Sequence, residues 1–409
     1  MKFNKKLHLS LLKLFHMKAK NVKSTRTPIY RDMGFLLEDV PTMKKAFTDE
    51  VNHPHNPDLY IYARYRNPNV VEAEERLMKL EGSKWTLLTE SGQAALDVAL
   101  SIFQRSNKSN KWLFFTEIYG GTNSYIDKVL VQRRGIEVIR FAPNGNSYSM
   151  EAFEKLISET KPDVVFFEVL SNPMLIAVDG EAIIKIAKRH GAKVIVDNTF
   201  ATPILWKPLN SGADLVYQSV TKYLAGHGNL SAGSISGNDP ELLKEAIEYR
   251  KWVGHMLSPD DAYRLIDMLK TFEMRFLKHC QNAHAIANFL ENHPLVENVL
   301  YPGLESHSTH NEAFRLFKGI AFGGMVTFDI KGSNREEKAQ RCNMFIQLVS
   351  DSIHLVPTLG DADTILMPVE PVWGDRYPFP GMIRLSVGIE DQKELLNVIG
   401  NALNLIGKD

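Results

Sequence analysis

The fold of this chain is decided by the stretch Lys193-Val194-Ile195-Val196-Asp197-Asn198-Thr199-Phe200 and by the segment that follows it. The first four residues form a short β-branched run, which is typical of a buried parallel strand with Asp197 at its carboxyl end. Residues 213–219 predict a second strand, which delivers Lys222 just past its end. Because ligands of open α/β sheets sit at the carboxyl ends of strands, we expect a carboxylate and a lysine to meet in one crevice.

A carboxylate and a lysine in one crevice suit the cofactor pyridoxal 5'-phosphate. This cofactor is held as a lysine Schiff base, and an acid partners its pyridinium nitrogen. An ionised Asp197 would keep the ring nitrogen protonated, which makes the ring a better sink for carbanion electrons. The sequence has no GxGxxG turn after the strand at 85–88 and no GxxxxGK[ST] motif, which disfavours a dinucleotide or a nucleoside triphosphate.

Composition sets the broad class. A chain of 409 residues exceeds what one core usually supports, so two domains are expected. Apolar residues make up 44% and charged residues 23%, and 48 basic side chains balance 48 acidic ones, which argues against a nucleic-acid partner. The two cysteines, Cys280 and Cys342, favour a reducing cytoplasm and provide neither a disulfide scaffold nor a metal site.

Residues 1–23 carry six lysines before Asn21 and an apolar patch that Lys13 interrupts. No Ala-x-Ala site follows, so a secretory signal is not predicted. We expect a basic amphipathic arm that packs on a partner subunit, and a true start at Met17 is the alternative. No run approaches the length of a transmembrane span, so no membrane partner is expected.

Strands and helices alternate through the first two thirds of the chain, which predicts a parallel doubly wound sheet. Tyr119, Asn172 and Asp197 each follow or end a strand, so we expect them to share one edge of that sheet. The strands expected before Asp197 cover 85–88, 112–115, 137–141 and 163–168, and the helices 70–81, 150–159 and 181–189.

Ser258-Pro259-Asp260-Asp261 is a helix start, and we expect one long helix from it to about Leu290. That helix marks the predicted boundary. An N-terminal arm and extended segment covers 1–60, a large domain 61–257, and an α+β domain 258–409. In the last of these, Arg384 lies in an apolar strand, where burial is costly unless an anion pairs with it.

Two loops are candidate phosphate sites. Residues 60–68 are dense in tyrosine and arginine, and they are either a surface loop or a phosphate clamp. Ser91-Gly92 opens an Ala-rich helix, and a small-residue turn at a helix start presents free backbone N–H groups to an anion.

Together these residues resemble the Cys/Met-metabolism (transsulfuration) family of fold-type I pyridoxal-phosphate enzymes. It includes cystathionine γ-synthase, the cystathionine lyases, methionine γ-lyase and O-acylhomoserine sulfhydrylase. The resemblance runs from about Thr27 to the C-terminus, and its strongest motif joins residues 196–203, 219–223 and Gly226-His227. It implies an α/β fold, with a mostly parallel seven-stranded sheet between helices in the large domain and a smaller α+β C-terminal domain.

The resemblance also implies a role for each candidate residue. Lys222 would form the Schiff base and shuttle the proton, Asp197 would hold the pyridine nitrogen, and Tyr119 would stack on the ring and act as a candidate acid or base. The residues implied to cradle the cofactor are Ser91, Gly92, Gln93, Thr199, Ser219 and Thr221.

The implied substrate is a small amino acid whose carboxylate binds Arg384, helped by Asn172 and the backbone near Thr358. Tyr62 and Arg64 would reach the phosphate of the neighbouring subunit's cofactor. A dimer is then the minimal catalytic unit, and a homotetramer, a dimer of dimers, is the implied assembly.

Several positions depart from the family pattern. Asn229 and Gln93 replace the usual Asp and the usual Met or small residue. Gly121 replaces the cysteine that marks methionine γ-lyase, and Pro357 stands where γ-specific members often carry glutamate. Met367–Gly374 replaces a His-Pro-Ala-Ser segment at the side-chain pocket. These changes leave the cofactor chemistry intact and the substrate open.

Three functions remain open at this point. The first is a carbon–sulfur lyase that acts by β- or γ-elimination, as cystathionine γ-lyase does. The second is a γ-replacement transferase of the γ-synthase or sulfhydrylase type, and Gly360-Asp361-Ala362 looks like the sulfhydrylase and methionine-lyase forms of that turn. The third is an inactive scaffold relative, which the intact Lys222 and Asp197 disfavour.

Overall fold

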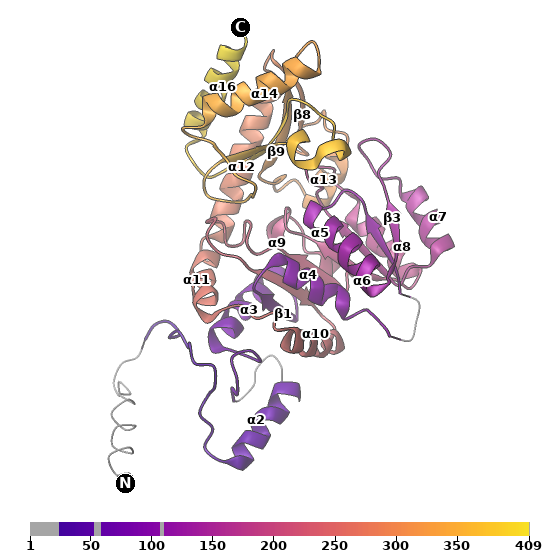
Figure 1. The fold of residues 1–409 in the computed structure, drawn as a ribbon, viewed down its shortest axis with the longest axis vertical. Coiled ribbons are helices and arrows are strands. Elements are labelled where there is room, and N and C mark those ends of the chain that lie inside the picture. Colours follow the sequence, from indigo (N-terminus) through magenta and orange to yellow (C-terminus); the bar gives the residue numbers. More distant parts are fainter. Residues whose placement is uncertain (1–23, 53–58, 107–109, 409) are drawn as a thin grey trace.

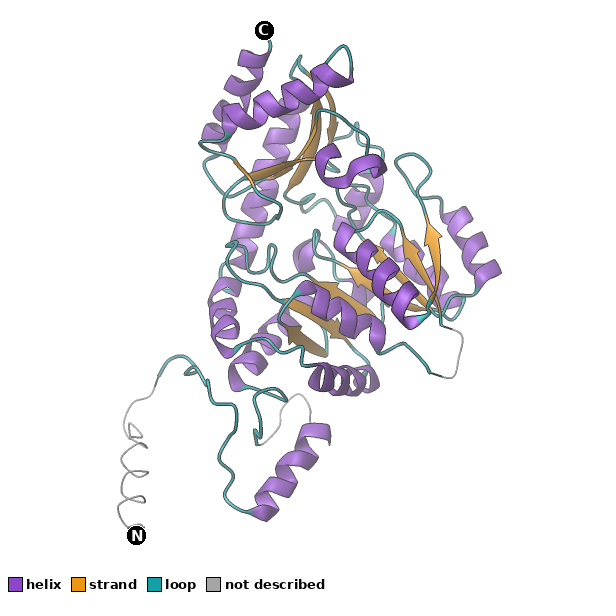
Figure 2. Ribbon diagram, viewed as in Figure 1, coloured by secondary structure: helices purple, strands orange, loops and turns teal. Residues whose placement is uncertain are grey.

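The computed structural model describes residues 24–52, 59–106 and 110–408, which form two sheets flanked by helices (Figures 1 and 2). The larger sheet has seven strands: β1 (Trp85–Thr89), β2 (Lys111–Phe115), β3 (Glu137–Phe141), β4 (Val164–Glu168), β5 (Lys193–Asp197), β6 (Leu215–Gln218) and β7 (Gly233–Gly237). Their order is β1-β7-β6-β5-β4-β2-β3. All neighbours from β6 to β3 are parallel, and β7 is antiparallel to both β6 and β1, so the predicted mostly parallel sheet is confirmed.

Buried strands and capped helices explain why the sequence forms this sheet. Strands β4 and β6 are buried along their whole length, which requires apolar residues on both faces and layers of helices above and below. Asn67 and Ser91 cap helices through their side-chain oxygens, which fixes where those helices begin. The helices of this layer are α3 (Pro68–Glu81), α4 (Gly92–Ser101), α5 (Gly120–Tyr125), α6 (Gln132–Arg134), α7 (Met150–Thr160), α8 (Gly180–Arg189), α9 (Thr202–Leu205) and α10 (Pro240–Val253).

The smaller sheet has five strands in the order β10-β11-β12-β9-β8 and lies in the upper part of Figure 1. Its strands are β8 (Val296–Leu300), β9 (Met325–Ile330), β10 (His354–Leu355), β11 (Ile365–Pro368) and β12 (Met382–Ser386). Helices α13 (His310–Phe317), α14 (Arg335–Val349) and α16 (Gln392–Ile406) belong to the same half. A second apolar cluster, separate from that of the large sheet, lies between this sheet and its helices.

The single long helix expected from Ser258 to Leu290 was wrong. The structure has two helices, α11 (Pro259–Leu269) and α12 (Phe272–Glu291), with a corner at residues 270–271. The guanidinium of Arg275 donates to the Met268 carbonyl at 2.9 Å and to Thr271 Oγ1 at 3.2 Å, so side-chain bonds hold the corner where helical ones end. Helix α12 then runs from the first apolar cluster into the second.

The N-terminal segment extends away from the body of the molecule, and α2 (Val40–Asn52) lies at the end opposite the C-terminus (Figure 1). This segment carries a row of exposed apolar side chains: Met33, Leu36, Val40, Met43 and Phe47. The basic arm predicted over residues 1–23 lies outside the described residues. Within them, no helix is both long and apolar enough to cross a bilayer.

Candidate active site

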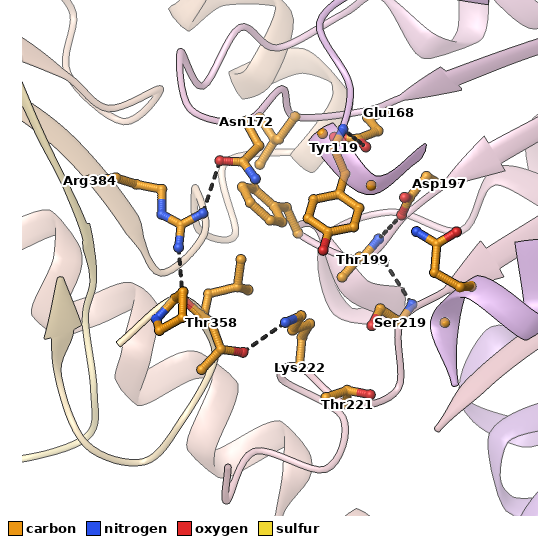
Figure 3. Close-up of a pocket in the computed structure, with 18 of the residues that line it drawn as sticks. Tyr119, Glu168, Asn172, Asp197, Thr199, Ser219, Thr221, Lys222, Thr358 and Arg384 are labelled. Atoms are coloured by element: carbon orange, nitrogen blue, oxygen red, sulfur yellow. Dashed lines mark hydrogen bonds between the residues drawn. The ribbon is translucent and has the colours of Figure 1, made fainter. Parts of the chain in front are cut away.

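A cavity of about 540 Å³ opens where the large sheet meets the smaller one (Figure 3). Asn172 follows β4, Asp197 ends β5 and Lys222 follows β6, and all three line the cavity together with Tyr119. The prediction that Tyr119, Asn172 and Asp197 share one edge is therefore confirmed. The smaller half contributes Arg384 from β12 and other residues from its loops.

Lys222 reaches into this cavity from a tight turn after β6. The turn is closed by bonds from Ala225 N to the Val220 carbonyl at 2.9 Å and from Gly226 N to the Lys222 carbonyl at 2.7 Å. The Lys222 amine donates to Thr358 Oγ1 at 2.8 Å. Burial lowers the pKa of the amine to about 8, and the positive charge of Arg384 adds to the effect. A lysine with this pKa is neutral far more often than a surface lysine, as a nucleophile or base requires.

Asp197 is a buried carboxylate that faces the cavity. It accepts a bond from the Thr199 backbone N–H at 2.9 Å, and Thr199 Oγ1 accepts from Ser219 N at 2.9 Å, which ties β5 to the Lys222 turn. Burial raises the pKa of Asp197 to about 6. Among the described residues, no cationic side chain forms an ion pair with it. A buried acid without a cation suits a ligand that brings its own positive charge, such as a pyridinium nitrogen.

Glu168 is a second buried carboxyl that the sequence analysis did not assign to the site. It ends β4 in register with Asp197, and it accepts a bond from the Tyr119 backbone N–H at 2.5 Å. Burial and the adjacent Asp197 raise the pKa of Glu168 well above its ordinary value, which favours the neutral carboxyl. Its signal was present in the sequence: an acidic residue ends the apolar run of β4, as Asp197 ends that of β5.

The turn before α4 has room for an anion because Gly92 carries no side chain. A Cβ at this position would lie 2.8 Å from Tyr217 Oη and 3.0 Å from Ser219 Oγ. Ser91 Oγ accepts from Ala94 N as the helix cap, so the serine orders the turn. The helix N-terminus and the Ser219 hydroxyl thus form a small, electropositive cradle that fits a phosphate group.

Three more predicted cofactor residues line the same cavity, namely Gln93, Thr199 and Thr221. Thr221 Oγ1 donates to the Ala232 carbonyl at 3.1 Å and accepts from Ala232 N at 3.0 Å, so its hydroxyl ties the Lys222 turn to the following segment. Tyr119 is half-exposed, and its ring projects into the cavity (Figure 3). A side chain at Gly121 would collide with this ring, since a Cβ would lie 2.3 Å from Tyr119 Cε1.

Arg384 is buried at 4% exposure with no carboxylate partner among the described residues. It donates to Asn172 Oδ1 at 3.1 Å, to the Thr358 carbonyl at 2.7 Å and to Met367 Sδ at 3.0 Å, while its Nε has no acceptor there. Burial lowers the pKa of Arg384 to about 10, which still leaves it charged at neutral pH. A buried, oriented and uncompensated guanidinium is a binding site for a carboxylate.

Tyr62 and Arg64 are not among the residues that line this cavity. Arg64 donates to the Lys251 carbonyl at 2.6 Å, and its guanidinium carbon lies 5.5 Å from the centre of the Tyr62 ring. The structure therefore brings together every predicted site residue except these two. The lining residues that the sequence analysis did not assign to the site include Glu168, Leu170, Phe200, Tyr217, Leu359 and Ser124.

The fold and this cavity define a fold-type I pyridoxal-phosphate-dependent enzyme, in which a strand-end acid, a lysine turn, a glycine cradle and a buried arginine surround one space. Residues 11–404 match the family described as Cys/Met metabolism PLP-dependent enzyme, and the chain belongs to that family. The protein is therefore an enzyme of sulfur amino-acid metabolism, and its cofactor is pyridoxal 5'-phosphate.

Curated relatives and solved structures agree with this assignment. The chain is 35% identical to the cystathionine gamma-lyase of Bacillus subtilis, over 85% of this chain and 89% of that protein. It is 33% identical to the L-methionine gamma-lyase of Fusobacterium nucleatum subsp. polymorphum, over 93% of both. The structure of cystathionine gamma synthase from Xanthomonas oryzae in complex with cystathionine matches with a TM-score of 0.81 at 27% identity, over 93% of both chains.

Proposed function

We propose that this enzyme is a carbon–sulfur lyase that cleaves its substrate by β- or γ-elimination, which is the reaction type of cystathionine γ-lyase. The proposal is carried by Thr358, which holds two functional groups close together. Its hydroxyl accepts a bond from the Lys222 amine, and its carbonyl accepts a bond from the Arg384 guanidinium. A substrate whose carboxylate lies on Arg384 thus has its Cα close to a base. The net reaction consumes one water and gives a thiol, a 2-oxo acid and ammonia.

Different residues of the cavity would hold different parts of the cofactor. Lys222 would form the covalent link, Asp197 would pair with the ring nitrogen, and Tyr119 would cover the ring. The Gly92 cradle and Ser219 would hold the phosphate. When bound, pyridoxal 5'-phosphate is an electron sink that stabilises negative charge at the substrate Cα.

The protein's own groups supply the proton transfers. Lys222, whose pKa is lowered to about 8 by burial and by Arg384, takes the proton from Cα and returns it at a later step. Tyr119 is half-exposed beside the same space, so its hydroxyl can deliver a proton to the departing thiolate. Arg384 and Asn172 keep the α-carboxylate oriented, which fixes the Cα–H bond toward the lysine.

A γ-replacement transferase is the second candidate, of the cystathionine γ-synthase or O-acylhomoserine sulfhydrylase type. It uses the same residues, and it differs only in that a thiol adds before product release. The chain's 32% identity to the cystathionine gamma-synthase of Mycobacterium leprae, over 93% of this chain, favours it. An inactive scaffold is disfavoured by the intact cavity, in which Lys222 and Asp197 keep their perturbed pKa values.

We also propose a homotetramer, a dimer of dimers, in which Tyr62 and Arg64 complete the neighbouring subunit's site. Two observations support this. Both residues are absent from the lining of the cavity in their own chain, and the segment that precedes them exposes apolar side chains. The proposed domain organisation is an N-terminal arm and extended segment (1–60), a large cofactor-binding domain (61–257) and a C-terminal α+β domain (258–409). A cytoplasmic location is proposed because both cysteines are free.

The test is a substrate panel with the purified enzyme loaded with pyridoxal phosphate. Cystathionine, methionine, and O-acylhomoserine with sulfide are each supplied, and 2-oxo acid and new thioether or thiol are measured. Formation of 2-oxo acid without added thiol supports the lyase, and condensation products alone support the transferase. Lys222→Ala is the control. If this variant retains the visible absorption of a lysine-bound cofactor, the role of Lys222 is refuted.

A further inference from the structure

Three of the four lysine, arginine and acidic side chains that line the cavity are engaged by the cofactor or the α-carboxylate in the proposed function. Of the described lining residues, two are cationic, Lys222 and Arg384, and two are acidic, Glu168 and Asp197. Lys222 links the cofactor, Asp197 meets its ring nitrogen, and Arg384 takes the α-carboxylate. Glu168 lies in register with Asp197 and accepts a bond from the Tyr119 backbone N–H, and burial favours its neutral form. The lining therefore offers no further charge to a second charged group on the substrate.

The space beside Arg384, which is left for the substrate side chain, is lined by apolar groups. The guanidinium carbon of Arg384 lies 5.5 Å from the centre of the Trp373 ring, and Met367 Sδ accepts a bond from the same guanidinium. The apolar residues that line the cavity are Leu170, Phe200, Pro357, Leu359, Met367, Val372 and Trp373. Trp373 and Val372 belong to α15 (Glu370–Trp373), within the segment that departs most from the family pattern.

Hydrogen bonds and packing contacts hold the α15 segment at both of its ends, so Trp373 has a defined position. Trp373 N donates to the Val369 carbonyl at 3.0 Å, and its ring packs against a buried cluster that includes Tyr377. Arg376 bonds the Thr116 carbonyl and pairs with Glu117. Arg376 is not among the lining residues, and its charge is met by Glu117 rather than by the cavity.

A second carboxylate or ammonium in this space would lose its hydration without gaining a partner from the lining of its own subunit. An uncharged thioether would instead bury apolar surface against an indole and a methionine sulfur. We propose that Trp373, Met367 and Val372 select amino acids with one carboxylate and an uncharged leaving group, such as an S-alkyl thioether. Substrates whose leaving group carries a second amino-acid head are disfavoured. The proposal rests on the proposed function, because it takes Arg384 as the site of the α-carboxylate.

Two amino acids without a leaving group separate side-chain charge from reactivity. Norleucine ends in a methyl group, and 2-aminoadipate has the same three methylenes but ends in a carboxylate. Binding to the holoenzyme is followed by the change in visible absorption of the cofactor. We expect norleucine to bind at least about tenfold more tightly than 2-aminoadipate, because the side-chain carboxylate of 2-aminoadipate must lose its hydration without gaining a partner. Equal or tighter binding of 2-aminoadipate would reveal a cation at that end, including one from a partner subunit, and would overturn the proposal.

A matched pair of substitutions tests the assignment to the α15 segment. Val372→Arg places a cation at a half-exposed lining position, and we expect it to shift the ligand preference toward 2-aminoadipate at least about tenfold. Phe379→Arg adds the same charge nearby, at a residue that does not line the cavity, and should leave the preference unchanged. Equal effects of both variants, or no effect of Val372→Arg in a folded, cofactor-loaded protein, would contradict the proposal.

Cleavage is measured separately with methionine and cystathionine, so that a failure of the proposed lyase function can be distinguished from a failure of the proposed side-chain selection. If norleucine is preferred but neither substrate gives 2-oxo acid, the lyase is refuted while the selection of uncharged side chains stands. If cystathionine is cleaved with a kcat/KM equal to that of methionine, the lyase stands and the selection is refuted.

Discussion

Glu168 and Asp197 lie side by side, in register, at the carboxyl ends of β4 and β5, and each carboxyl accepts a bond from one backbone N–H. Two such acids do not both ionise in a buried site, because each charge opposes the other. Asp197 has a pKa of about 6, and burial together with the Asp197 charge raises the pKa of Glu168 well above its ordinary value, which favours the neutral form of Glu168. The pair thus offers a single negative charge to the cofactor ring and a neutral support to Tyr119.

If Glu168 acts as a neutral group, catalysis needs the bond that it accepts from the Tyr119 N–H but does not need its negative charge. Glu168→Gln keeps an oxygen for the Tyr119 N–H, so kcat/KM should stay within about threefold of wild type. Glu168→Ala removes the acceptor and should lower kcat/KM at least about tenfold by displacing Tyr119. Both values come from steady-state assays. A loss in Glu168→Gln as large as that in Glu168→Ala would show that the carboxylate itself is needed.

Cofactor attachment should follow the titration of Lys222. Only the neutral amine attacks an aldehyde, so the rate of covalent cofactor uptake by the apoenzyme should rise with pH. Its midpoint should lie near 8, rather than near the ordinary value of 10.5. Removal of a neighbouring positive charge by Arg384→Met should raise that midpoint. Stopped-flow absorption across the pH range checks this, with Arg264→Met at an exposed ion pair as control. A midpoint unaffected by Arg384→Met would refute the coupling.

Arg384 should act through geometry as well as charge. Arg384→Lys keeps the charge but loses the planar fork that Asn172 and the Thr358 carbonyl orient. We expect KM for the amino-acid substrate to rise about 100-fold, which is about 3 kcal/mol, with a smaller change in kcat. Steady-state kinetics measure the split. An unchanged KM would remove Arg384 from the carboxylate site.

The proposed sharing of sites between subunits predicts complementation. Lys222→Ala and Arg64→Ala enzymes are each expected to be impaired, and a hybrid dimer of the two should contain one site with neither defect. After subunit exchange of equal amounts, about a quarter of wild-type activity should return. If Arg64 serves the cavity of its own chain, the mixture should stay at the mean of the two parents. The measurement is activity before and after exchange under mild denaturant.

Glu81 predicts a pH-dependent loss of stability. It is fully buried, accepts a bond from Gln218 Nε2 at 2.8 Å, and burial raises its pKa from 4.5 to about 7. Because the folded-state pKa exceeds the unfolded one, its contribution is fully present below pH 4.5 and is lost as pH rises through 7. The loss is about 3 kcal/mol above that pH.

Glu81→Gln should therefore be more stable than wild type at pH 8 by up to about 3 kcal/mol and nearly equal to it at pH 4.5. Urea unfolding at the two pH values measures the difference. Glu75→Gln, at an exposed position of the same helix, should change neither value. A Glu81→Gln variant with the same pH dependence as wild type would contradict the assignment.

Sequence patterns located most of the site because its residues stand at strand ends. Asp197, Asn172, Tyr119 and Lys222 were found from buried apolar runs and the polar residues that follow them, and all line the cavity. Glu168 was missed although it has the same signal, because nothing local shows that a strand-end acid faces a ligand. The break between α11 and α12 was missed because it depends on side-chain bonds from Arg275, which helical periodicity does not reveal.

The sequence by itself determined the class of protein: alternating apolar strands and amphipathic helices predict the sheet, and Asp197 and Lys222, together with the family motif around them, indicate the cofactor. Only the tertiary structure decided which groups meet. It placed Thr358 and Arg384, from the smaller half, against Lys222, and it put Trp373 beside the guanidinium. The reason is physical. Local sequence fixes backbone conformation and burial, whereas charge pairing and cavity shape depend on residues brought together from distant parts of the chain.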